Sequence, residues 1–441
     1  MTRALLVALP GRAFGLLNRN RSALAALIVR GAGVVAGFVL TFLIARWFGP
    51  EANGIYALVT QSAIFLSVVA VGGLDLAVVR EFSRSVALGR PLARQAVLGV
   101  LIQTAVLALL LGGVVLALEP LIIPRLIGSH AIAYIGLILA VLILLRGLMR
   151  IIAAILRSQS RFSAGQAIEL FLMPVATIAL LFTWDAADRH IGTILLASVF
   201  AAGLVVTFGI ILALRGASSE AQAVNVSQKV LFFGALPMWG MAIAQNLADW
   251  FGLVSVNFWA GTADAGIYRV GSQIASVLPI VALSLLGTFT ARIAAAIHAE
   301  QRDEMARLSR TATLLSLLIF GPIAVAIFAF AEPILAAFGP DFVSGAATLR
   351  VLVIGALLVA GFGIAGQVLV MIGQARLNLM VNLGTTLVIL IGAPLTAASA
   401  GGLGVAVLIA ALNGTKTLIY FLAVRKLEGF NAFTGRLVQR D

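Results

Sequence analysis

The chain has 441 residues, of which 61% are hydrophobic and 11% charged, and its mean hydropathy is +1.11. This composition excludes a soluble globular protein, in which about 25% of residues are charged, and predicts that the membrane is the solvent. The formal charge of +13 does not indicate nucleic-acid binding, because the basic residues lie at the ends of apolar segments rather than in one basic module.

The first 22 residues are predicted to form a basic cytoplasmic arm that can lie on the membrane surface. Its apolar stretch is short and is interrupted by Pro10, so it does not resemble a cleaved signal peptide. Its four basic residues are Arg3, Arg12, Arg19 and Arg21.

Apolar runs of about 20 residues, the length that crosses the hydrocarbon core as a helix, follow the arm. They predict an all-α membrane protein with about twelve transmembrane helices. The predicted spans are 23–46, 54–79, 95–118, 131–156, 163–184, 190–214, 230–258, 264–296, 310–330, 347–372, 377–398 and 402–424.

The distribution of Lys and Arg predicts that both termini are cytoplasmic. Of the 30 basic residues, 24 fall on the side of the N-terminus, Lys416 among them, and Arg30 lies within a span. The opposite side has Arg46, Arg125, Arg189, Arg269 and Arg350.

An internal repeat is suggested by Gly54-Ile55-Tyr56, which recurs as Gly266-Ile267-Tyr268, 212 positions later. A weaker correspondence relates 157–161 to 372–376. The shift covers six spans, an even number, and therefore predicts two parallel six-helix repeats with a cavity between them. A chance recurrence of Gly-x-Tyr at a helix start is the alternative.

The repeat divides the chain into two predicted lobes. The polar segment 215–229 has no apolar run and is the natural linker between them. The predicted division is an N-terminal lobe at 23–214, a C-terminal lobe at 230–424 and a cytoplasmic tail at 425–441.

Four arginines on the predicted fourth span form one basic stripe, because their spacing places them within about 60° of arc on a helix. Such a stripe can bind a phosphate group that enters from the inner leaflet. The alternative is contact with lipid headgroups at the membrane surface, which suits the last two members better than the first. The members are Arg146, Arg150, Arg157 and Arg161.

Arg30 lies about 10 Å into the first span by helix rise. It can line a cavity or extend its side chain back to the interface. The candidate residues for binding an anionic headgroup are Arg30, Arg146, Arg150 and Arg157.

Three acidic residues within or near spans are candidates for ion coupling or for counter-ions of arginine. Asp249 lies in a polar cluster of an otherwise apolar helix and could bind a proton or Na⁺, or form a structural ion pair. The same alternatives, binding of a proton or Na⁺ or a structural ion pair, apply to Glu169. Asp75 is close in sequence to Arg80 and Glu81 and could belong to an interfacial network with them.

Motifs for other chemistries are absent from the sequence. There is no Walker A motif, no His-Glu-x-x-His pair and no acidic loop suited to Mg²⁺. The chain has no cysteine and three histidines, which gives no indication of a metal site. The sequence therefore predicts neither an enzyme nor an ATP-driven pump, and no metal or organic cofactor.

Several segments resemble the Wzx-type polysaccharide flippases of the multidrug/oligosaccharidyl-lipid/polysaccharide (MOP) exporter superfamily. The resemblance covers most of the chain, and its motifs are Ala45–Pro50, Gly54–Tyr56, Gly72–Glu81, Phe338–Phe342, Met371–Arg376 and Gly402–Val407.

The resemblance implies a two-lobed inner-membrane bundle that works by alternating access. It would move an undecaprenyl-diphosphate-linked glycan from the cytoplasmic to the periplasmic leaflet, for polysaccharide or lipopolysaccharide biosynthesis. The implied partners are membrane lipids and glycan polymerase or export proteins, and H⁺ or Na⁺ could drive transport.

Other functions stay open at this point. A multidrug antiporter of the same superfamily would favour an acidic cavity, whereas the arginines inside the predicted spans outnumber the acids. A membrane scaffold of a glycan-assembly complex would tolerate neutral substitutions at Arg30, Arg146 and Asp249. An integral glycosyltransferase would require a large soluble loop, which the sequence does not contain.

Overall fold

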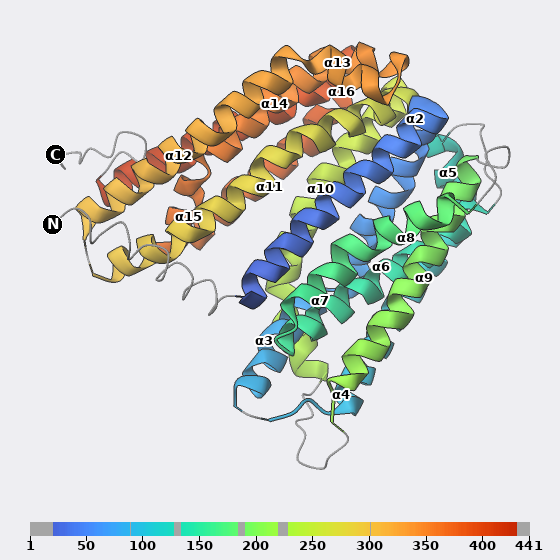
Figure 1. Ribbon diagram of the computed structural model, residues 1–441, viewed down its shortest axis with the longest axis horizontal. Helices are drawn as coiled ribbons and strands as arrows, with labels where there is room; N and C mark the ends of the chain where they lie inside the picture. Colours follow the sequence, from blue (N-terminus) through green and yellow to red (C-terminus); the bar gives the residue numbers. More distant parts are fainter. Residues whose placement is uncertain are drawn as a thin grey trace, which may run out of the picture. The chain divides into compact units, whose positions relative to one another are not determined.

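The computed structural model describes residues 21–88, 90–127, 134–183, 190–218, 228–299 and 301–429. Within these ranges the chain is helical almost throughout, as Figure 1 shows, and the one β-bridge joins Ala93 to Ser218. The predicted all-α class is confirmed. Most of the predicted arm (1–22), linker (215–229) and tail (425–441) lies outside the described residues.

The helices fall into two compact units. Unit 1 comprises 1–41, 59–124 and 130–243, and unit 2 comprises 42–58, 125–129 and 244–441. The helices up to the middle of the chain are α2 (Arg21–Val71), α3 (Leu74–Ala87), α4 (Arg94–Ala117), α5 (Glu119–Ile127), α6 (Ile135–Ser158), α7 (Phe162–Gln166), a π-helical turn (Ala167–Phe171), α8 (Leu172–Leu181) and α9 (Ile191–Arg215).

The second part of the chain continues the helical pattern. Its helices are α10 (Gln228–Ala260), α11 (Thr262–His298), α12 (Arg302–Ala329), α13 (Ala331–Phe338), a 3₁₀ turn (Pro340–Gly345), α14 (Ala346–Phe362), α15 (Ile364–Met371) and α16 (Ala375–Glu428).

Nine helical segments in the described part of the chain are long and apolar enough to cross a membrane, so the protein is a multi-pass membrane protein. Two of them, at 25–71 and 376–428, are about twice the length of one crossing. Both are broken internally, α2 at Gly49 and α16 at Ala400 and Gly401, close to predicted boundaries between spans. The count of twelve and the cytoplasmic location of the termini stay predictions.

The backbone repeats at the same shift as the sequence motif. Gly49 has φ 79° and ψ −177°, and Gly261, 212 positions later, has φ 93° and ψ 171°. Each glycine lies directly before the helical segment that carries Gly-Ile-Tyr. A positive φ at both positions favours glycine, since other residues would be strained there.

The Gly-Ile-Tyr motif makes a close helix contact within unit 2. A Cβ atom on Gly54 would overlap the carbonyl oxygen of Thr262, and a Cβ atom on Gly266 would overlap that of Pro50. The buried Asn53 amide donates to the Gly266 carbonyl at 3.0 Å. The shared motif therefore serves the packing of the fold, as expected for a feature present in both repeats.

Candidate functional site

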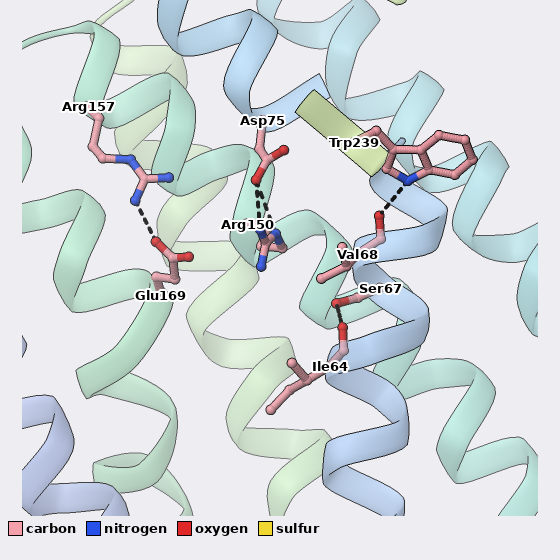
Figure 2. A network of polar contacts seen from close by, with 8 residues as sticks. All are labelled: Ile64, Ser67, Val68, Asp75, Arg150, Arg157, Glu169 and Trp239. Atoms are coloured by element: carbon pink, nitrogen blue, oxygen red, sulfur yellow. Dashed lines mark hydrogen bonds and ion pairs between the residues drawn. The ribbon is translucent and has the colours of Figure 1, made fainter. Parts of the chain in front are cut away.

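The arginine stripe of α6 is held by carboxylates from two other segments of unit 1 (Figure 2). Arg150 donates to Asp75 Oδ2 from Nε at 3.2 Å and from Nη2 at 2.9 Å. Arg157 Nη1 donates to Glu169 Oε2 at 2.6 Å. Two of the three predicted counter-ions therefore pair with two of the predicted headgroup-binding arginines.

The position of Asp75 follows from the break between α2 and α3. Gly72 and Gly73 have φ of 63° and 75°, a conformation that ends α2 and starts α3 directly afterwards. Asp75 thus lies in the first turn of α3, where the helix dipole favours a negative charge. Its side chain is buried and faces Arg150 of α6.

The expected network of Asp75 with Arg80 and Glu81 is corrected by this geometry. Arg80 binds Glu81 at 2.9 Å on the exposed side of α3. Arg80 follows Asp75 by five positions, which places their side chains about 140° apart around the helix axis. The partner of Asp75 comes from a different helix, so the spacing of residues along the sequence does not indicate it.

Glu169 lies in the π-helical turn between α7 and α8. Pro174 follows within α8, and because proline has no N–H, the carbonyl four residues before it lacks its usual helical donor. Gly165 lets α7 approach α6, since a Cβ there would lie 2.9 Å from the Ala153 carbonyl oxygen and 3.0 Å from Arg157 Cγ. The irregular helix thus carries Glu169 to Arg157, and π-helical turns of this kind are frequent at functional sites.

The other predicted arginines differ from these two in their surroundings. Arg146 is half-buried, one turn before Arg150. The predicted stripe does not extend to Arg161, because α6 ends at Ser158 and Ser160 breaks the helix with a positive φ of 61°. Arg161 is exposed and donates from Nη1 to the Leu212 carbonyl at 3.1 Å. Arg30 is exposed on α2, and no carboxylate among the described residues pairs with it.

A second charged cluster lies in unit 2 and is separate from the stripe. Asp249 of α10 interacts electrostatically with Arg269 of α11 and with Lys416 of α16. Tyr268 and Tyr56 contribute to the same environment. The electrostatic environment of Asp249 thus includes two cations, Arg269 and Lys416.

Lys416, which is counted above with the cytoplasmic charges, lies inside both the predicted span 402–424 and α16. Lys416 precedes the end of α16 at Glu428 by 12 residues, about 18 Å by helix rise, and therefore lies well inside the span. A lysine in the middle of an apolar run is the sequence signal of an intramembrane charge.

Neighbouring contacts show that α10, α11 and α16 converge near this cluster. A Cβ at Gly252 would lie 3.7 Å from the Tyr268 hydroxyl and 3.6 Å from Val405 Cγ1. Thr386 donates to the Ala244 carbonyl at 3.3 Å. No group of three or more His, Cys, Asp or Glu in the described ranges could hold a metal ion.

Family models match most of the chain. Residues 20–290 match the model described as polysaccharide biosynthesis protein, and residues 237–395 match MatE. No curated protein gives a significant match to the sequence.

Solved structures of the MOP superfamily share the fold. A multidrug resistance MATE family transporter in an inward-facing conformation is 17% identical with a TM-score of 0.71, over 91% of this chain and 98% of that chain. The lipid II flippase MurJ in an inward closed conformation is 15% identical with a TM-score of 0.70, over 92% and 87%. A MOP superfamily transporter from Pyrococcus furiosus is 14% identical with a TM-score of 0.59, over 93% and 96%.

These likenesses show the fold of MOP-superfamily transporters. The family is shown by the model that matches more than half of the residues. The chain therefore belongs to the polysaccharide biosynthesis protein family.

Proposed function

We propose that this protein is a flippase that moves a polyprenyl-diphosphate-linked oligosaccharide from the cytoplasmic to the periplasmic leaflet of the inner membrane. The family match and the fold likeness to a lipid II flippase support a lipid-linked glycan as substrate. Glycan polymerase or export proteins are the partners that such a role requires.

One observation carries the choice of an anionic substrate. Arg150 and Arg157 lie on one helix of unit 1, and each is held by a carboxylate, Asp75 or Glu169. Guanidinium groups oriented in this way suit the oxygens of a phosphate and not a cationic substrate. The proposed headgroup-binding residues are Arg30, Arg146, Arg150 and Arg157, with Asp75 and Glu169 as counter-ions.

The ion pairs orient guanidinium groups without using all of their donors. A guanidinium has five N–H donors, and Arg150 uses two positions on Asp75 while Arg157 uses one on Glu169. The two arginine side chains are 25% and 23% exposed, which leaves them accessible to phosphate oxygens. A diphosphate can bind these free donors while its lipid chain stays in hydrocarbon.

The Asp249 cluster is the proposed site of coupling to H⁺ or Na⁺. A proton or cation that neutralises Asp249 would leave Arg269 and Lys416 without their compensating charge. A change in occupancy would therefore change the stability of the packing of α10, α11 and α16, which is a means of favouring one conformation over another.

The test is glycan export by cells that lack the gene and carry wild type, Arg30→Ala, Arg146→Ala or Asp249→Asn at equal membrane abundance. We expect loss of surface glycan and accumulation of lipid-linked precursor on the cytoplasmic side. Arg84→Ala is the control, since Arg84 is exposed in the last turn of α3. Full export by all three site variants would contradict the proposal and favour a scaffold.

A multidrug antiporter is the second candidate, favoured by the MatE match over 237–395. It predicts that cells carrying the protein gain resistance to cationic drugs and that Asp249→Asn abolishes this resistance. The flippase proposal predicts unchanged drug resistance in the same cells.

A further inference from the structure

Two apolar grooves lie along α9 in unit 1, and α6 contributes to the lining of both. The first, here the Phe208 groove, has a volume of about 650 Å³ and is lined by residues that include Leu145, Leu180 and Phe208. The second, the His190 groove, has a volume of about 560 Å³ and is lined by residues that include Leu137 and His190. Both volumes are in the range of ligand pockets.

The two grooves follow one another along the same face of α9. Leu196 lines the His190 groove, and Val199 and Gly203 line the Phe208 groove. Residues three and four apart share a helix face, so the two grooves lie in line along α9 and are here called the α6–α9 seam. From His190 to Ile211 the seam runs about 31 Å by helix rise, which is the full thickness of the hydrocarbon core.

The surface of the Phe208 groove is suited to a hydrocarbon chain. Its walls include Leu204, which is 62% exposed, and Phe208, which is 55% exposed. The Thr207 hydroxyl donates to the Gly203 carbonyl at 2.9 Å and presents no free donor to the groove. At Gly203 a Cβ atom would meet nothing within 4 Å, so the floor is open.

One end of the seam is basic. Arg215 follows Ile211 by four residues and therefore continues the same face of α9. Arg161 reaches this end and binds the carbonyl of Leu212. Both arginines are exposed, and no carboxylate within the described ranges pairs with either. Arg161 follows the end of α6 by three positions, so the basic end of the seam lies close in the chain to Arg157 of the α6 stripe.

We infer that the α6–α9 seam binds the polyprenyl chain of a polyprenyl diphosphate, with Arg161 and Arg215 at its phosphate groups. This inference rests on the proposed flippase function. The length of the seam favours a polyprenyl chain over a phospholipid, because a phospholipid acyl chain occupies one leaflet, whereas the seam extends through both. The seam would guide the lipid chain while the headgroup crosses.

The test measures equilibrium binding of undecaprenyl diphosphate to the purified full-length protein in lipid nanodiscs. Gly203→Leu fills the open floor, and we expect it to weaken binding by about tenfold. Gly113→Leu is the matched control, because a Cβ at this exposed glycine of α4 also meets nothing within 4 Å. We expect that control to bind as wild type does.

A second variant and two other lipids complete the test. Arg161→Ala with Arg215→Ala leaves the groove unfilled and should also weaken binding by about tenfold. Farnesyl diphosphate, which has the same phosphates and a short chain, should bind wild type more weakly than undecaprenyl diphosphate. Displacement by an equal concentration of phosphatidylglycerol would indicate an ordinary anionic-lipid site and overturn the inference.

The binding assay is independent of glycan export. Wild-type affinity in both Gly203→Leu and the double arginine variant overturns the seam even where cells export glycan. If glycan export does not depend on the protein, the flippase proposal is overturned, whatever the binding assay shows.

Discussion

Gly54 and Gly266 make equivalent contacts with one another's helices: each packs against the carbonyl oxygen of the residue four positions before the other. These carbonyls belong to Thr262 and Pro50, so all four residues obey the 212-residue shift of the repeat. A contact that is symmetric under the repeat is expected where two copies of one ancestral helix pair meet.

Replacing either glycine with alanine should destabilise the protein. The added Cβ overlaps backbone atoms that cannot rotate away, and overpacking of this kind costs about 1–3 kcal/mol or more. Thermal unfolding in detergent, followed by size-exclusion chromatography, measures the effect. Gly37→Ala is the control within α2, since a Cβ there meets nothing within 4 Å, and a loss of stability as large as that of Gly54→Ala would contradict the explanation.

Removing one partner of the Asp75 and Arg150 pair should cost about 3–5 kcal/mol, because the other charge is left largely buried. The double variant Asp75→Asn with Arg150→Gln should lose less than the sum of the single variants. A double-mutant cycle on thermal stability measures this coupling. Arg80→Ala breaks an exposed pair and should cost about 1 kcal/mol or less, and purely additive losses at Asp75 and Arg150 would exclude direct coupling.

The Arg157→Lys variant tests whether position 157 needs only a positive charge or also the planar hydrogen-bond donors of arginine. Lysine keeps the positive charge for Glu169 but lacks the planar donors that bind phosphate in a bidentate manner. We expect near wild-type thermal stability with reduced glycan export at equal membrane abundance. Arg84→Lys should export normally, and normal export by Arg157→Lys would remove Arg157 from the phosphate path.

The Asp249 cluster should respond unequally to neutral substitutions. Asp249→Asn leaves two cations without a carboxylate, whereas Lys416→Gln leaves one carboxylate facing Arg269. Thermal stability should therefore fall more in Asp249→Asn than in Lys416→Gln. The double variant should be more stable than Asp249→Asn alone, and equal stabilities for all three variants would show that the three charges do not compensate one another.

The sequence could predict features that depend on local pattern. Apolar length gave the helical spans, and the spacing of Arg146, Arg150 and Arg157 placed them on one helix. Their partners could not be read in the same way, since Asp75 meets Arg150 across 75 positions and through a glycine break that sets the direction of α3. Counting Lys and Arg on each side of the membrane does not reveal the interaction of Lys416 with Asp249. That interaction depends on how three helices pack.

Residues 42–58 belong to unit 2, so the C-terminal part of the chain packs against a segment from the N-terminal part. A fragment that begins at Gln228 would lack Asn53, the donor to the Gly266 carbonyl, and the helix that fills the glycine contact. If the chain were cut between α9 and α10, the two pieces would have to be produced in the same cell. Their function together would depend on whether the segment around Gly49 in the first piece packs against the second piece.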